Sequence, residues 1–261
     1  MERRTYLRSL GAASTVGVAG LAGCLEESLG AVGLGDGGET VLGPPDEERG
    51  EPSHPIHGDE FPPFSLPDPI TDEPVSRRDF VGERTFLMTY LFTECPDGAC
   101  PALLQIFRQI QEDAAQRGYS DELALLPMTF DPERDTAERL AEYGDRQGVD
   151  YEADNWHFLR PESYEEGKAL LHDEFGMRIE RVEGDDLEEH GDHEDHDHGH
   201  DDYSFTHINL VLLVNEAGIV ERAYPRALVA EAGGGVRTIL ADTQAVVTAQ
   251  NDHLDVDDER Q

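Results

Sequence analysis

The chain has 261 residues and a formal net charge of −37 at pH 7, from 57 acidic and 20 basic residues. Such an acidic protein repels phosphate backbones, which argues against nucleic acid as a partner. The acidic residues are spread along the sequence, and Lys168 is the only lysine. We interpret this pattern as an adaptation of solubility and folding to high salt, where charge repulsion is screened.

The N-terminus resembles an export signal. Arg3 and Arg4 precede a short apolar stretch of small residues over 12–23, which is a twin-arginine pattern. The stretch ends in the letters LAGC, which resemble a lipobox whose cysteine, Cys24, is lipidated and becomes the mature N-terminus. An uncleaved anchor is the alternative. We therefore expect residues 1–23 to be a lipoprotein signal, and the protein to work at the extracytoplasmic face of the cell membrane, anchored there by its lipid.

The composition predicts how the rest of the chain is divided. Residues 24–61 are rich in Gly, Pro, Asp and Glu and have almost no periodic apolar pattern, so we expect a flexible acidic tether. Residues 62–250 are enough for one domain with a buried core. The last segment, 251–261, is predicted to be an acidic tail.

Apolar periodicity predicts the first elements of the domain. Residues 64–82 indicate a short hairpin, and 85–92 indicate a buried first central strand. An amphipathic helix follows and ends at Gly118. The next apolar run, 123–130, has strand length. Because Pro127 within it has no N–H, this strand must lie at an edge of the sheet or contain a bulge.

Helices and a hairpin complete the domain. Asp135 and Glu138, three residues apart, match a capping box and predict a helix that closes near Gly148. Cap and turn chemistry is the favoured role for Asp131, Arg134 and Asp135. The later predicted elements are a helix over 162–175, strands over 207–214 and 219–224, and a helix near 236–247.

This order of elements is typical of an α/β fold of the thioredoxin-like sandwich type: a central mixed β-sheet flanked by helices, with an N-terminal hairpin extension. Cys95 and Cys100 lie in the loop between the first central strand and its helix. A thiol at a helix N-terminus faces unpaired N–H groups and the positive end of the dipole, so we expect its pKa to fall. The pair is a structural disulfide, a redox dithiol or two metal ligands. A disulfide across so short a loop removes little chain entropy, which favours the last two.

Three separated motifs in this order resemble the Sco/SenC family, which are membrane-tethered, thioredoxin-like proteins that deliver copper to cytochrome c oxidase. The resemblance spans residues 62–248. It implies that Cys95, Cys100 and His207 bind one copper ion. The motifs are Phe92–Asp97 with Cys100-Pro101, then Thr129–Thr136, and then His207 opening a strand that ends in a turn at Gly218.

The residue types agree with copper. Two thiolates suit Cu(I), and an added imidazole also allows Cu(II), whereas a closed structural zinc site would need a fourth ligand. The sequence departs from the family in one respect, since four residues rather than three separate the cysteines. Gly98 in this longer loop can take a positive φ and form a small bulge. Copper affinity and redox potential are therefore not transferred from the family.

The tract 183–202 is a second departure from the family pattern. Its acidic composition predicts a disordered insertion, and its histidines are dense enough to bind transition metals weakly. It enters just before residues 203–207, so its root should lie near the proposed site. We weigh a copper-gathering arm against an acidic loop without function. The histidines are His190, His193, His196, His198 and His200.

Two functions follow from the resemblance, so whether the protein is an enzyme stays open. One is a metallochaperone that delivers copper to the dinuclear copper centre of cytochrome c oxidase subunit II. The other is a thiol-disulfide oxidoreductase that reduces the cysteines of that centre, with Cys95 attacking and Cys100 resolving the mixed disulfide. A dedicated reductase has no use for a histidine beside its dithiol, which favours copper. A peroxidase is a distant third, because Thr93 is poorly spaced from Cys95 for that chemistry.

Overall fold

The computed structural model describes one compact unit within Gly35–Gln261. Cys24, His207 and the five histidines of the insertion lie outside the described residues, as does the expected signal segment. In the described part of the chain, no helix is both long and apolar enough to cross a membrane. The described residues are 39–45, 52–183, 203–206, 208–230, 233–251 and 254.

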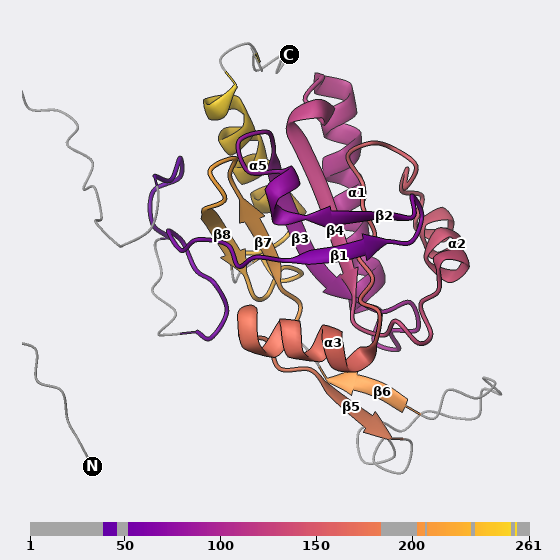
Figure 1. Ribbon diagram of the computed structural model, residues 1–261. Coiled ribbons are helices and arrows are strands. Elements are labelled where there is room, and N and C mark those ends of the chain that lie inside the picture. The colour runs from indigo at the N-terminus through magenta and orange to yellow at the C-terminus, as the bar shows by residue number, and fades with distance from the viewer. Residues whose placement is uncertain are drawn as a thin grey trace, which may run out of the picture. The chain divides into compact units, whose positions relative to one another are not determined.

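Four strands form the central sheet in the order β4-β3-β7-β8 (Figure 1). β3 pairs in parallel with β4 and antiparallel with β7, which pairs antiparallel with β8. Every residue of β3, β4 and β7 is buried, as expected for strands covered on both faces. The predicted mixed sheet is confirmed. The strands are β3 (Thr85–Leu91), β4 (Leu123–Thr129), β7 (Val211–Val214) and β8 (Val220–Tyr224).

Pro127 lies in β4, which is an edge strand of this sheet. The amides of Leu125 and Thr129, on either side of it, donate outward to the carbonyls of Asn155 (2.8 Å) and Leu159 (2.9 Å). The proline lies on the same outward side of the strand. Its missing N–H therefore costs no bond to β3. Of the two alternatives that the sequence left, an edge position or a bulge, the structure shows the edge position.

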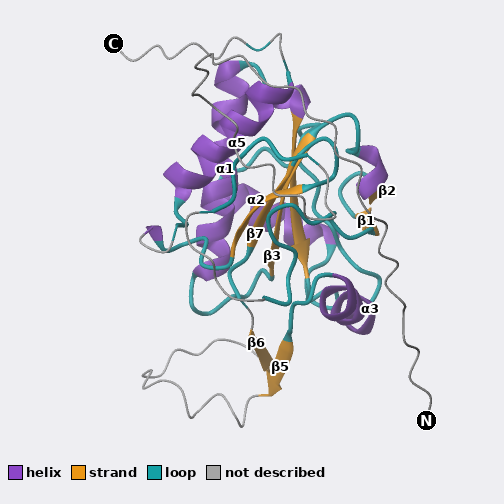
Figure 2. Cartoon of the chain, turned by 90° about the vertical axis from the view of Figure 1, so that its left-hand side faces the viewer, coloured by secondary structure: helices purple, strands orange, loops and turns teal. Residues whose placement is uncertain are grey.

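Helices cover one face of the sheet, and a hairpin and a short helix lie on the other (Figures 1 and 2). α1 and α5 are on the first face, with α2 beside α1, while α3 and the β1–β2 hairpin are on the second. The elements are β1 (Ser65–Asp68), β2 (Glu73–Ser76), α1 (Ala99–Arg117), α2 (Ala137–Gln147), α3 (Tyr164–Ala169) with its π-helical continuation Leu170–Glu174, α5 (Val236–Gln250), and the short 3-10 turns Arg77–Asp79 and Ser120–Glu122.

Helix α1 matches its predicted pattern. Its apolar face is buried, and it ends at Gly118, whose φ of 78° and amide bond to the Ala114 carbonyl close the last turn. The buried residues of this face include Leu103, Ile106, Phe107, Ile110 and Ala114.

A two-stranded ribbon that the sequence did not predict joins the two sides of the histidine tract. β5 (Glu180–Glu183) pairs antiparallel with β6 (Tyr203–Thr206), apart from the central sheet. The strand predicted over 207–214 is shorter, since β7 begins at Val211. Periodicity shows that a segment is extended, but it does not show which distant segment will pair with it.

The predicted capping box is wrong by one residue. Thr136 is the N-cap of α2, and its side chain accepts a bond from the Arg139 amide at 3.4 Å. Asp135 is instead fully buried, and its carboxylate contacts Thr93 and Thr129. The cap on Thr136 leaves Asp135 available for long-range contacts.

The described residues of the expected tether segment contact the domain. Phe61 is fully buried in the hydrophobic core. The Glu221 carboxylate, fully buried in β8, accepts bonds from the amides of Val41 (2.8 Å) and Leu42 (2.9 Å) and from Asn215 Nδ2 (2.6 Å). A buried carboxylate requires such donors, so this contact ties residues 41 and 42 to the edge of the sheet.

Candidate dithiol and metal centre

Cys95 and Cys100 lie where β3 leads into α1, at the carboxyl end of a central strand. Gly98 is the N-cap of α1 with a φ of 74°, and Cys100 is in the first helical turn. A glycine takes this left-handed conformation without strain. The positive φ that the sequence allowed at Gly98 is therefore observed.

The structure holds both cysteines as thiols, close to each other. The Cys100 amide donates to the Cys95 sulfur at 3.4 Å, and the two thiols share a side-chain hydrogen bond. Cys100 is fully buried, whereas Cys95 is partly exposed. Cys95 is therefore the sulfur that an external partner reaches first.

The hydrogen bond to Cys95 raises the pKa of the Cys100 thiol, and burial raises it further. The Phe92 backbone, which hydrogen-bonds to the Cys100 sulfur, acts in the opposite direction. The prediction that a helix N-terminus lowers the thiol pKa is therefore wrong for Cys100. The loss of water and the adjacent sulfur outweigh the helix dipole at this position.

Asp97, within the loop, bonds to both Cys95 and the helix. Its Oδ1 accepts a bond from the Cys95 thiol at 2.9 Å and one from the Ala99 amide at 2.9 Å. Because Gly98 has no side chain, Asp97 satisfies an amide of the first turn in its place. No role was predicted for Asp97, although an aspartate just before a helix is an ordinary cap signal.

Asp135 lies under the start of the same loop. It accepts bonds from the amide and the hydroxyl of Thr93 and from the hydroxyl of Thr129. Thr93 and Asp135 are 42 residues apart, so no local pattern in the sequence connects them.

The ribbon approaches this end of the sheet through aromatic contacts. The Phe205 ring of β6 lies 5.2 Å from Phe92 and 5.1 Å from Phe130, between ring centroids. The Tyr203 ring has guanidinium groups of Arg134 and Arg181 near its face, at 4.1 Å and 3.3 Å from its centroid. The prediction that the root of the insertion lies near the cysteine loop agrees with these contacts.

The described residues supply two of the three predicted metal ligands. His207 follows Thr206, the last residue of β6, and lies outside the described residues. Within the described ranges, no group of three or more His, Cys, Asp or Glu side chains is arranged to hold a metal ion. Whether the imidazole completes the site therefore remains a prediction.

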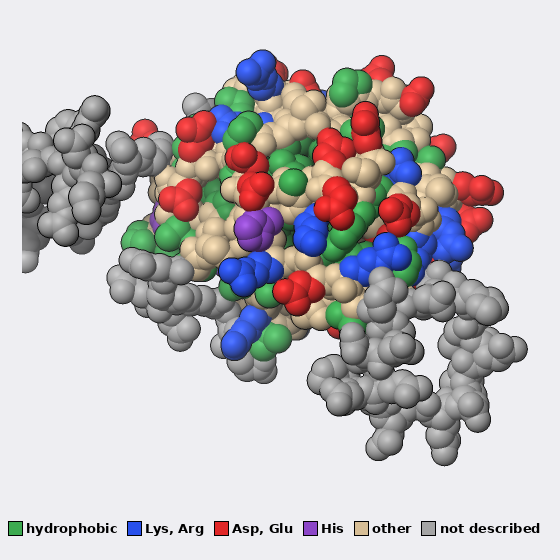
Figure 3. All heavy atoms as spheres, turned by 60° about the horizontal axis from the view of Figure 1, so that its bottom comes forward, with side chains coloured by type: hydrophobic (Ala, Val, Ile, Leu, Met, Phe, Trp, Pro, Cys, Tyr) green, Lys and Arg blue, Asp and Glu red, His purple; other side chains and the backbone are tan. Residues whose placement is uncertain are grey.

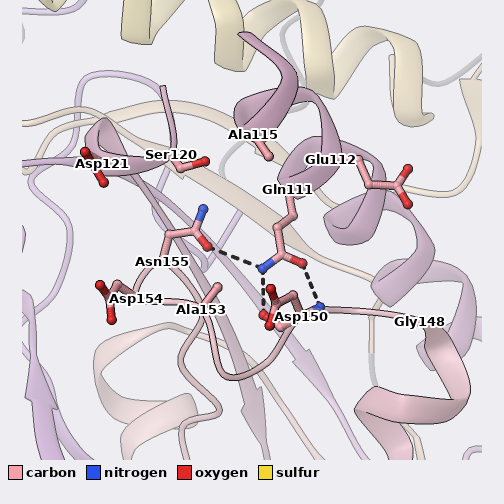
Figure 4. A pocket seen from close by; sticks show the side chains of 10 residues that line it. All are labelled: Gln111, Glu112, Ala115, Ser120, Asp121, Gly148, Asp150, Ala153, Asp154 and Asn155. Atoms are coloured by element: carbon pink, nitrogen blue, oxygen red, sulfur yellow. Dashed lines mark hydrogen bonds between the residues drawn. The ribbon is translucent and has the colours of Figure 1, made fainter. Parts of the chain in front are cut away.

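A hollow of about 390 Å³ lies away from the cysteines, toward the carboxyl end of α1 (Figure 4). Gln111 in its wall bonds the Asp150 backbone through both side-chain atoms, at 2.8 Å and 3.0 Å, and Asn155 Oδ1 at 3.3 Å. Gln111 follows Cys100 by eleven positions in α1, roughly 16 Å along the axis. The hydrogen bonds of Gln111 hold the loop after α2 in place. The hollow is therefore not part of the candidate site.

Acidic side chains are spread over the face shown in Figure 3 rather than gathered in one patch, and basic side chains lie among them. Near the loop, Arg139 pairs with Glu94 at 3.1 Å and Arg134 pairs with Asp131 at 3.3 Å. The Arg139–Glu94 pair is exposed to solvent, so it contributes little to stability.

Comparison with models of known protein families shows which family this chain belongs to. The model of the SCO1/SenC family matches residues 55–233, which is more than half of the chain. The chain belongs to the SCO1/SenC family. A comparison with curated proteins found no match.

Solved members of the SCO1/SenC family share the fold. A SCO1/SenC family lipoprotein from Bacillus anthracis str. Ames is 17% identical with a TM-score of 0.54, over 72% of this chain and 94% of that one. BsSco, a member of the Sco family of cytochrome c oxidase assembly proteins, is 18% identical with a TM-score of 0.53, over 76% and 98%. Yeast Sco1 with copper bound is 19% identical with a TM-score of 0.50, over 74% and 93%. The predicted thioredoxin-like fold is thereby confirmed.

Proposed function

We propose that this SCO1/SenC protein is a copper metallochaperone, with Cys95, Cys100 and His207 as the ligands of its cargo. The observation that supports this most is the hydrogen-bonded thiol pair at the start of α1, with one sulfur buried and one partly exposed. Of the solved relatives, BsSco is described as a member of a family of cytochrome c oxidase assembly proteins, and yeast Sco1 was solved with copper bound. The proposed acceptor is the dinuclear copper centre of cytochrome c oxidase subunit II.

The thiol pair suits a soft ion. Both sulfurs can reach one ion once their protons leave, and thiolates select Cu(I). Copper, when bound, supplies the positive charge that lets two adjacent thiolates coexist in a mostly buried loop. The partly exposed Cys95 is the ligand that an incoming thiolate of the acceptor displaces first, and the buried Cys100 is displaced last.

The proximity of the two thiols also supports the second candidate, a thiol-disulfide oxidoreductase. The Cys95 thiolate attacks an acceptor disulfide and forms a mixed disulfide, releasing one acceptor thiolate. Cys100 then attacks Cys95, the mixed disulfide breaks, and the second acceptor thiolate leaves. Two electrons pass to the acceptor, and the Cys95–Cys100 disulfide that remains must be reduced by an external dithiol.

The sequence supports two further parts of the proposal. Removal of residues 1–23 and lipidation of Cys24 would anchor the protein outside the cytoplasm. The tract 183–202 would gather copper through its histidines and pass it to the loop, since Phe205, in the strand that follows the tract, contacts Phe92. Deleting residues 186–201 should then slow copper loading at limiting metal, and unchanged loading would refute this role.

Copper stoichiometry and absorption of the reduced full chain test the main proposal. We expect one copper with thiolate-to-copper charge-transfer bands in the wild type, and loss of those bands in Cys100→Ser and in His207→Ala. His172→Ala is the matched control, because His172 is exposed and bonded to Asp173. Copper binding that ignores both substitutions would refute the metallochaperone and favour the reductase.

A further inference from the structure

The Asp135 carboxylate is fully buried and holds three donor groups. Its Oδ1 lies 2.5 Å from the Thr93 hydroxyl, and its Oδ2 lies 2.5 Å from the Thr129 hydroxyl. The Thr93 amide donates to both oxygens, at 3.3 Å and 3.2 Å. A buried carboxylate is stable only with such donors, so this arrangement is specific.

Asp135 connects through Thr93 to the sulfurs. Thr93 stands two residues before Cys95, and the Phe92 backbone hydrogen-bonds to the Cys100 sulfur. The two residues that directly follow β3 are therefore both engaged, Phe92 with the Cys100 sulfur and Thr93 with Asp135. The direction in which the chain leaves the strand determines where both sulfurs lie.

The support beneath Asp135 is itself fixed by backbone contacts. The Asp135 amide donates to the Asp131 carbonyl at 2.8 Å. The Arg160 side chain donates to the carbonyls of Asp135 (3.0 Å) and Pro132 (2.6 Å). The loop that contains Asp135 thus holds the carboxylate in place, and Thr93 of the cysteine loop hydrogen-bonds to that carboxylate.

We infer that Asp135 is a positioning residue of the dithiol, which acts through Thr93 to set how readily Cys95 and Cys100 join and how they present themselves to a shared ion. This inference rests on the proposed function of the two thiols. It does not depend on whether that function is delivery or reduction, because disulfide formation needs no metal.

The alternative is that Asp135 only stabilises the fold. Variants of Thr93 and Thr129 distinguish this alternative from a positioning role. Both hydroxyls lie 2.5 Å from the carboxylate, but Thr93 belongs to the cysteine loop and Thr129 ends β4. Removing either hydroxyl takes one bond from Asp135. Only removal of the Thr93 hydroxyl should directly change the positions of the Cys95 and Cys100 sulfurs.

The experiment measures the dithiol–disulfide equilibrium of the full chain in glutathione buffers, by alkylation and mass spectrometry of the Cys95 and Cys100 peptides. We expect Thr93→Val and Asp135→Asn to shift the equilibrium constant by about tenfold, 30 mV for a two-electron couple. Thr93→Ser should restore it, and Thr129→Val should lower stability without shifting it. If Asp135→Asn does not fold, the threonine variants decide the question.

Equal shifts in Thr93→Val and Thr129→Val, or no shift in either, would overturn the inference. Copper binding by the wild type is measured separately. A wild type without copper would refute the metallochaperone and leave the redox result for Asp135 intact, so the two failures are distinguishable.

Discussion

The Phe205 ring at the base of the ribbon meets the Phe92 ring edge to face, with centroids 5.2 Å apart and planes at 70°. Phe92 directly follows the strand that leads to Cys95, and Phe205 is two residues before His207. This contact joins the segment that holds the insertion to the segment that holds the dithiol. It makes the aromatic cluster of Phe92, Phe130 and Phe205 a common support for both.

Replacing Phe205 with alanine should therefore destabilise the protein. The ring is almost fully buried, so we expect the free energy of unfolding to fall by about 3 kcal/mol, measured by urea denaturation. The control is Tyr203→Phe, which keeps the ring and removes only its hydroxyl bond to Asp131 at 3.0 Å. That loss should cost about 1 kcal/mol. An unchanged urea midpoint for Phe205→Ala would contradict the role of the cluster.

The two cysteines should differ sharply in reactivity. Cys100 has no exposed surface and Cys95 is partly exposed, so an alkylating reagent reaches Cys100 only after local opening. We expect Cys95 in Cys100→Ser to react roughly a hundredfold faster than Cys100 in Cys95→Ser, as for an opening free energy of about 3 kcal/mol. Site-resolved alkylation with mass spectrometry measures both rates, and equal rates would show that the buried position is readily opened.

Asp135 should make stability depend on pH in a defined direction. Burial raises its pKa from 3.8 to about 6, with the neighbouring Asp131 charge adding to this, while bonds from Thr129 and Thr93 oppose it. Because the folded pKa is above the unfolded one, ionising Asp135 costs more in the folded state. Its contribution is most favourable below pH 4 and is lost as the pH rises through 6.

Asp135→Asn removes this titration. The difference in unfolding free energy, variant minus wild type, should therefore grow by roughly 2.4 kcal/mol between pH 4 and pH 7. Urea denaturation of both proteins across this range measures it. Asp131 titrates in both proteins and largely cancels in the difference. A difference that stays constant with pH would contradict the raised pKa.

Gly176 should tolerate no side chain, because the segment before Phe61 packs on it. Its φ is 60°, and a Cβ there would lie 1.7 Å from the Ser53 carbonyl oxygen. Gly118, with a φ of 78° and no atom within 4 Å of its Cβ position, is the matched control. We expect Gly118→Ala to cost about 1 kcal/mol from backbone strain alone, and Gly176→Ala about 3 kcal/mol or more, by urea denaturation. Equal losses would mean that Ser53 does not rest on Gly176.

The sequence alone determined the elements whose signals are local. The apolar runs of β3, β4 and β7, the amphipathic face of α1, and the closing glycines at 118 and 148 each report backbone conformation and burial within one segment. The cysteines at the junction of β3 and α1 followed from the same signals, whereas Pro127 left an edge position and a bulge as alternatives. The order of the motifs was enough to indicate the family.

The tertiary structure decided what depends on segments that are far apart in the chain. Asp135 contacts Thr93 instead of capping α2, β5 pairs with β6 across the insertion, and Glu221 binds the amides of residues 41 and 42. The direction of the Cys100 pKa shift was also decided there. A helix dipole can be predicted from the sequence, whereas burial and an adjacent sulfur exist only once the loop has folded onto the sheet.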